Sequence, residues 1–116
     1  MNRAIEVSGS FHIGQIVMHR RFGYRGVIYD VDPRFMLSDE WYDRVALSRP
    51  PKDLPWYHVL VDNLGSPTYV SERNLESAKG YEPIRHPLIE RYFALFNGSS
   101  YEPLNLRNRF GRRPYG

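Results

Sequence analysis

The side chains best suited to contact a ligand are four basic and two aromatic residues within seven positions of one another. They are His19, Arg20, Arg21, Phe22, Tyr24 and Arg25. Arginine binds phosphate through a planar fork, and an aromatic ring can stack on a base or touch its edge. The mixture is therefore consistent with a DNA contact. A solvated hairpin tip, with Phe22 covering the end of the fold, is an equally good interpretation.

A second basic group lies at the end of the chain. Its members are Arg107, Arg109, Arg112 and Arg113, and residues 103–116 contain no acidic side chain. The whole chain has 16 Lys and Arg, 13 Asp and Glu and a net charge of +3, so residues 1–102 are close to neutral. This tail is too polar to fold alone. It is therefore interpreted as a disordered arm, a nucleic-acid arm or a segment ordered by a partner.

Catalytic chemistry has little support in the sequence. The absence of cysteine excludes a disulfide, a thiolate metal site and a cysteine nucleophile. The four histidines have no metal-ligand spacing, and no glycine-rich loop carries the Lys-Ser/Thr pair of a nucleotide-binding loop. We therefore expect no enzyme activity, no cofactor and no metal.

One pair of carboxylates is the best candidate for catalysis or metal binding. Asp30 and Asp32 are two positions apart in a predicted strand, so both side chains would project from one face. They could bind a divalent cation or act as an acid–base pair, but no third ligand follows them. A structural role is favoured, in which Asp32-Pro33 begins a turn and Asp30 pairs with a nearby arginine. His58 is interpreted as a packed or hydrogen-bonded strand residue.

Alternating apolar residues and turn residues predict four strands, over residues 14–19, 26–32, 56–62 and 68–71. The first two are joined by a short segment with two glycines and form an antiparallel hairpin. A helix is expected after Ser38, its N-cap, with Trp41, Tyr42, Val45 and Ala46 on its apolar side. A single helical turn is expected at 72–75.

A second helix is predicted over residues 87–96, with Pro87 at its first position and Asn97-Gly98 as its C-terminal stop. Its apolar stripe consists of Leu88, Ile89, Tyr92, Phe93 and Phe96. We expect Phe93 or Phe96 to anchor this helix on the strands. An extended segment is expected over 99–106.

These elements predict a mainly β fold, a small SH3-like antiparallel β-barrel with a C-terminal helix packed on it. At 116 residues the chain has the size of one domain. We expect a flexible N-terminus over 1–10, the barrel domain with its helix over 11–106, and an Arg-rich tail over 107–116. The lack of a signal peptide, of a membrane-length apolar run and of cysteine predicts a cytoplasmic protein without membrane contact.

Several blocks of the sequence, in order, resemble the HspQ/YccV-like family. The first block is Phe11-x-Ile13-Gly14-Gln15-x-Val17-x-His19 and Gly23-Tyr24-x-Gly26-Val27-Ile28-x-Asp30-Val31-Asp32-Pro33. The second is Trp56-Tyr57-His58-Val59-Leu60-Val61 with Thr68-Tyr69-Val70-Ser71-Glu72-x-Asn74-Leu75. His86-Pro87 and the segment through Phe96-Asn97-Gly98 are similar to the longer members, including a version appended to a eukaryotic F-box protein.

The resemblance implies a heat-shock-associated protein that binds hemimethylated DNA, with an SH3-like barrel and neither catalytic residues nor a cofactor. The expected DNA contacts are the six residues around Phe22 and the four tail arginines. Family members are also implicated as specificity factors for the Lon protease, so the alternative is a protein-binding adaptor in stress proteolysis. A homo-oligomer is left open.

Overall fold

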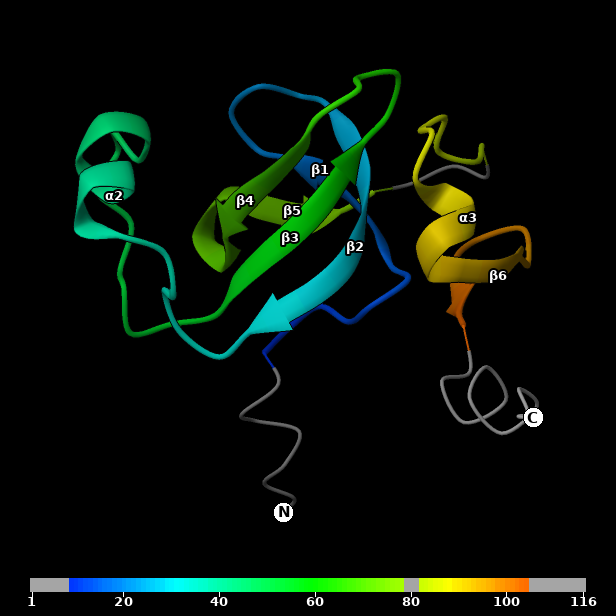
Figure 1. Cartoon of the computed structure of the whole chain (residues 1–116), viewed down its shortest axis with the longest axis horizontal. Coiled ribbons are helices and arrows are strands. Elements are labelled where there is room, and N and C mark those ends of the chain that lie inside the picture. Colours follow the sequence, from blue (N-terminus) through cyan, green and yellow to red (C-terminus); the bar gives the residue numbers. More distant parts are fainter. Residues whose placement is uncertain (1–8, 79–81, 105–116) are drawn as a thin grey trace, which may run out of the picture.

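The computed structural model describes residues 9–78 and 82–104, and its architecture is mainly β with antiparallel pairing (Figure 1). The strands are β1 (Ile16–His19), β2 (Arg25–Asp32), β3 (Trp56–Val61), β4 (Pro67–Ser71), β5 (Leu75–Ser77), β6 (Phe93–Phe96) and β7 (Tyr101–Pro103). The helices are α2 (Asp39–Val45), the 3₁₀ turn η1 (Glu72–Asn74) and α3 (Ile89–Tyr92). Helix α2 lies at one end of the molecule, and α3 and β6 at the other. No helix among these residues is long and apolar enough to cross a membrane.

The four predicted strands form, with β5, a five-stranded sheet in the order β4-β3-β2-β1-β5. The predicted hairpin is confirmed, since Ile16 of β1 pairs with Val27 of β2. The closed barrel is not confirmed, because no ladder joins β4 to β5 in the described parts of the chain. The Ser71 hydroxyl accepts the N–H of Arg73 and caps η1, so the chain turns out of β4 and enters β5 at the opposite edge.

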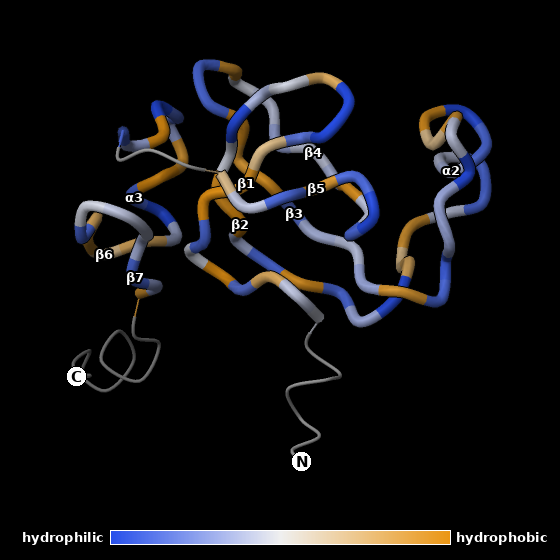
Figure 2. Tube along the Cα trace, turned by 180° about the vertical axis from the view of Figure 1, so that it is seen from behind, coloured by the Kyte–Doolittle hydropathy of each residue, from blue (hydrophilic) through white to orange (hydrophobic). Residues whose placement is uncertain are grey.

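Both faces of the sheet are covered, so neighbouring apolar residues of one strand enter different clusters. One cluster contains Val17, Ile28, Tyr57, Val59, Val61, Val70 and Leu75. The other contains Ile16, Val27, Leu60, Ile84, Phe93 and Tyr101. Figure 2 shows the hydrophobic stretches following β1 and β2 through the centre of the molecule. Burial on both faces explains why these strands read as nearly continuous apolar runs.

The predicted helix over 87–96 is wrong beyond Tyr92, because α3 ends there and Phe93 begins β6. Strand β6 pairs with β7 through Phe96 and Tyr101. The side-chain oxygen of Asn97 accepts the N–H groups of Ser99 and Ser100, 3.1 and 3.0 Å away, and closes the turn between the strands. The apolar spacing suits a helix, but this turn and the pairing to β7 satisfy the backbone of 93–96 as a strand.

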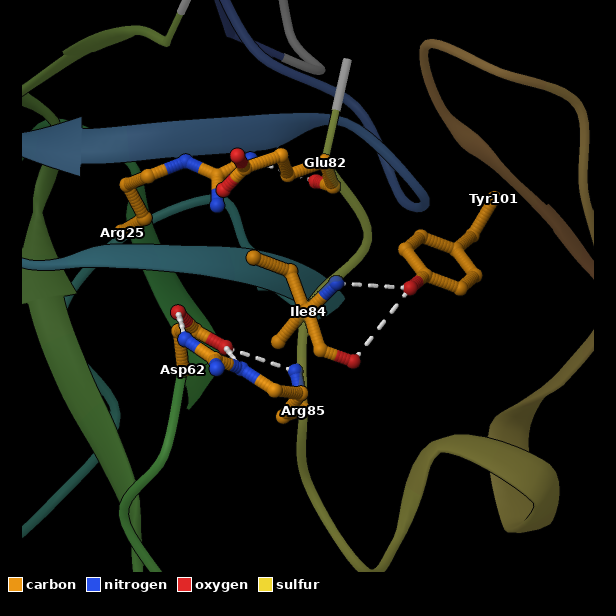
Figure 3. Close-up of polar contacts among 6 residues, drawn as sticks. All are labelled: Arg25, Asp62, Glu82, Ile84, Arg85 and Tyr101. Atoms are coloured by element: carbon orange, nitrogen blue, oxygen red, sulfur yellow. Dashed lines mark hydrogen bonds and ion pairs between the residues drawn. The ribbon is translucent and has the colours of Figure 1, made fainter. Parts of the chain in front are cut away.

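Segment 82–85 attaches the C-terminal part to the sheet (Figure 3). The Tyr101 hydroxyl accepts the N–H of Ile84 at 2.8 Å, and Asp62 at the end of β3 accepts the Arg85 N–H at 2.7 Å. The Arg85 guanidinium also donates to Asp62 at 3.1 Å, and these hydrogen bonds hold the pKa of Asp62 below its ordinary value. These contacts thereby hold Ile84 and Phe93 within the second cluster.

Helix α2 forms as predicted, with the Ser38 hydroxyl accepting the N–H of Trp41 at 3.0 Å. Tyr42 and Ala46 are buried, but Val45 is exposed although it was predicted on the apolar side. A third cluster joins α2 to the sheet through Phe35, Tyr42, Ala46, Trp56 and Tyr69. The single helical turn expected at 72–75 is η1. The N-terminal residues 1–8 and the tail over 107–116 lie outside the described residues.

Candidate nucleic-acid interface

The turn between β1 and β2 positions six of the predicted DNA contacts. The His19 N–H donates to the Tyr24 carbonyl and the Gly23 N–H to the His19 carbonyl, both at 2.9 Å. Gly23 has a φ of +76°, a conformation that glycine adopts without strain. The turn therefore projects residues 20–23 away from the sheet, and Phe22 at its end is 71% exposed.

His19 lies beneath this turn and is only 6% exposed. Its Nδ1 accepts the N–H groups of Arg21 and Phe22, each at 3.1 Å, and its ring stacks on the Phe22 ring at 4.5 Å. Burial, followed by the charge of Arg21, lowers the pKa of His19. The neutral imidazole therefore carries its proton on Nε2 and orders the backbone that presents Arg21 and Phe22.

Acidification is expected to destabilise the fold through His19. Since its folded pKa is lowered, the unfolded chain takes up a proton near the ordinary value of about 6.5 while the folded chain resists it. The free energy of unfolding should therefore fall as the pH drops below about 6.5. In a His19→Asn variant, whose amide oxygen can accept the same N–H groups without titrating, this fall should be shallower.

The measurement is urea unfolding of both proteins at several pH values between 5 and 7.5. Burial also lowers the pKa of His86, so part of the pH dependence should remain in the variant. Identical pH profiles for the two proteins would show that protonation of His19 does not oppose folding.

The three arginines of the turn region are held differently. Arg20 donates through Nε to the Leu75 carbonyl at 3.0 Å and lies 3.4 Å from Glu76. Arg25 donates to the Glu82 carbonyl at 2.6 Å (Figure 3). The Arg21 guanidinium makes no hydrogen bond or ion pair with residues 9–78 or 82–104, so it is the arginine of this group most available to a ligand. Arg107, Arg109, Arg112 and Arg113 lie outside the described residues.

An apolar groove beside the turn was not predicted from the sequence. It has a volume of about 340 Å³ and lies between the turn, β4 and the end of α2. Its lining includes Phe22, Tyr24, Trp41, Val45, Leu47 and Tyr69, with Arg21. Leu47 is 77% exposed, and with Phe22 and Val45 it gives this side of the molecule three exposed apolar side chains. The signal in the sequence was the unbroken apolar run Val45-Ala46-Leu47 at the end of a short helix.

The two carboxylates of β2 have partners that sequence spacing could not reveal. Asp32 accepts a hydrogen bond from the Tyr69 hydroxyl at 2.7 Å and lies 3.1 Å from Nε2 of His58. The expected pairing of Asp30 with an arginine is not formed among the described residues; its carboxylate accepts the Val31 N–H. Asp30, Asp32 and His58 offer one ligand atom each within 4.8 Å of one another, so a third donor does exist, on the neighbouring strand.

The fold and these surfaces define a small β-sheet binding module. A comparison with known protein families shows that the family model described as "Hemimethylated DNA-binding protein YccV like" matches residues 9–100. The chain therefore belongs to this YccV-like family. Membership places it among DNA-binding modules and confirms the resemblance drawn from the sequence.

Curated relatives carry the same region within much longer chains. The chain is 39% identical over 95 residues to "F-box only protein 21" of Homo sapiens and of Pongo abelii, and 38% identical to that of Mus musculus. These matches cover 80% of this chain but 15% of each relative. The chain thus spans a small part of the length of the relatives it matches.

Proposed function

We propose that this chain is a non-enzymatic DNA-binding module with a preference for hemimethylated duplexes. Membership of the YccV-like family is the observation that carries the proposal. Arg20, Arg21 and Arg25 neutralise phosphates, and the tail arginines extend that contact. Phe22, presented at the end of the β1–β2 turn, covers the N6 methyl group of a modified adenine in the major groove.

The methyl contact and the phosphate contacts contribute to DNA binding in different ways. Burying one methyl group is worth about 0.8 kcal/mol, which is a preference of roughly fourfold. Each neutralised phosphate contributes about 0.9 to the slope of log affinity against log salt, so three turn arginines give a slope near −3. Engagement of the four tail arginines as well would bring the slope to about −6. The expected behaviour is a steep salt dependence with a modest methyl preference.

Binding should be measured against salt with matched unmethylated, hemimethylated and fully methylated duplexes. An Arg21→Gln variant should flatten the slope by about 1 and leave the methyl preference unchanged. A Phe22→Ala variant should lose the methyl preference and keep the salt slope, because a phenyl ring contacts no phosphate. Removing residues 107–116 should flatten the slope without altering the preference. Arg91→Gln, on helix α3 and outside the turn, is the matched control and should change neither.

A slope near zero, with no binding near physiological salt, would contradict the proposal. If the Arg21 and Arg91 variants flatten the salt slope equally, phosphate contact is not localised at the turn. Loss of all methyl preference on removal of the tail would assign methyl recognition to residues 107–116 instead of Phe22.

The apolar groove favours a second candidate, a protein-binding adaptor that delivers substrates to a protease of the Lon type in a cytoplasmic stress response. Exposed Leu47 and Val45 lie in this groove. Among the described residues that line it, Arg21 is the only arginine or lysine and none carries a carboxylate, which suits an apolar segment better than a phosphate backbone. A Leu47→Ser variant discriminates the candidates. It should leave DNA affinity unchanged but abolish any stimulation of substrate degradation by the protease.

A further inference from the structure

We propose that Asp30, Asp32 and His58 form a binding site for a divalent transition-metal ion such as Zn²⁺. The three residues come from adjacent strands β2 and β3, and each offers one ligand atom that lies within 4.8 Å of the other two. The proposal is independent of DNA binding, since it uses none of the residues assigned to DNA.

A β-bulge brings the donors to one face of the sheet. Ile28 pairs with Val59, but the next paired residues are Asp30 and His58, so β2 has one more residue than β3 between these pairs. In a regular strand Asp30, two positions after Ile28, would share the face of Ile28, which is fully buried in the first hydrophobic cluster. The bulge instead turns Asp30 to the face of its partner His58. Asp32, two positions on, lies on the same face.

This face has a gap between two hydrophobic clusters. The cluster of Leu60 and Phe93 covers one end of it, and the cluster of Trp56 and Tyr69 covers the other. His58 lies between Leu60 and Trp56 along β3, with the Tyr29 and Tyr69 rings 5.7 and 4.6 Å from its own. A hollow of about 340 Å³ that His58 and Tyr69 line opens beside it.

Two of the donors, His58 and Asp32, are hydrogen-bonded to each other at a separation that also suits a shared metal ion. His58 Nε2 lies 3.1 Å from Asp32 Oδ2. Two ligands bound at about 2.0–2.2 Å are roughly 3 Å apart when they subtend a right angle and slightly more in a tetrahedron. Two of the three donors therefore need little movement. The third, Asp30, is an exposed carboxylate that can rotate toward the ion.

A second layer of hydrogen bonds orients the central carboxylate. The Tyr69 hydroxyl donates to Asp32 Oδ2 at 2.7 Å and accepts the Met36 N–H at 3.1 Å. Partners of this kind fix the direction of metal ligands.

The donor set indicates which ions fit. Two carboxylates and one imidazole are typical ligands of Zn²⁺ and other first-row divalent ions, and three protein ligands leave further coordination positions open. Mg²⁺ prefers oxygen ligands and keeps its waters, so the imidazole gives it no advantage. The site should therefore select Zn²⁺ over Mg²⁺.

Calorimetric titration of the full chain with Zn²⁺ alone tests the proposal, with Co²⁺ absorption as the spectroscopic readout of nitrogen and oxygen ligation. We expect one equivalent to bind and Mg²⁺ not to compete. Asp30→Asn and His58→Gln should each weaken Zn²⁺ binding at least tenfold, and Tyr69→Phe by about tenfold through the loss of orientation. His12→Gln, an exposed histidine outside the cluster, is the matched control and should bind as the parent does.

Because Asp30 is exposed, Asp30→Asn should fold normally, and its thermal unfolding with chelator present checks this. The absence of Zn²⁺ binding by the parent chain would overturn the proposal. So would unchanged binding in folded Asp30→Asn and His58→Gln variants. Loss of binding in His12→Gln alone would assign the ion to a surface histidine instead.

Discussion

Replacing Phe93 with alanine is expected to lower the free energy of unfolding by about 3–5 kcal/mol. Phe93 is 4% exposed and packs with Ile16, Val27, Leu60 and Tyr101, where its ring centroid lies 5.3 Å from that of Tyr101. Truncation removes the buried ring and leaves a cavity between the sheet and the β6–β7 hairpin. For a domain of this size the melting temperature should fall by more than ten degrees.

Leu95→Ala is the matched control, because Leu95 lies two positions along the same strand and is 55% exposed. Its effect should stay within about 0.5 kcal/mol. Chemical denaturation of the three proteins measures both changes. A Phe93 variant that unfolds with the parent would mean that the hairpin is not packed on the sheet in solution.

Gly14→Ala is expected to destabilise the protein by about 3 kcal/mol. Gly14 has a φ of +92°, where an L side chain costs roughly 1–2 kcal/mol. A Cβ atom there would also overlap the carbonyl oxygen of Tyr101, and that contact is with backbone, which cannot move aside freely. The Tyr101 N–H donates to the Gly14 carbonyl at 2.8 Å, so separating the two segments would also forfeit a hydrogen bond worth about 1 kcal/mol.

Substitutions at two other glycines separate the cost of the positive φ from the cost of the close contact with Tyr101. Gly23 has a φ of +76° and open space around it, so Gly23→Ala should show the conformational cost alone. Gly65 has open space and no positive φ, and Gly65→Ala should be neutral or stabilising by up to about 1 kcal/mol. Urea unfolding of the three variants ranks their free energies of unfolding. If Gly14→Ala costs no more than Gly23→Ala, the close approach of Tyr101 contributes nothing to stability.

Local patterns were enough to predict the four long strands and helix α2. Runs rich in β-branched and aromatic residues, bounded by turn residues, mark β1 to β4. A serine followed by Asp39 and Glu40 marks the start of α2. The turn that carries Arg21 and Phe22 was predicted for the same reason, since its glycines and flanking strands are contiguous in the chain. These features depend on residues a few positions apart, so local preferences are enough to predict them.

Contacts between distant residues decided the remainder. The apolar spacing of 87–96 fits a helix as well as a strand, and pairing with Tyr101 selects the strand after Tyr92. The same holds for the carboxylates of β2, because His58 and Tyr69 reach Asp32 only across strand pairs 26 and 37 positions apart. The sequence by itself determined which segments extend and which residues the turn displays. Only the tertiary structure decided the covering of the second sheet face, the groove and the Asp–Asp–His cluster, since strand register and a one-residue bulge set which side chains meet.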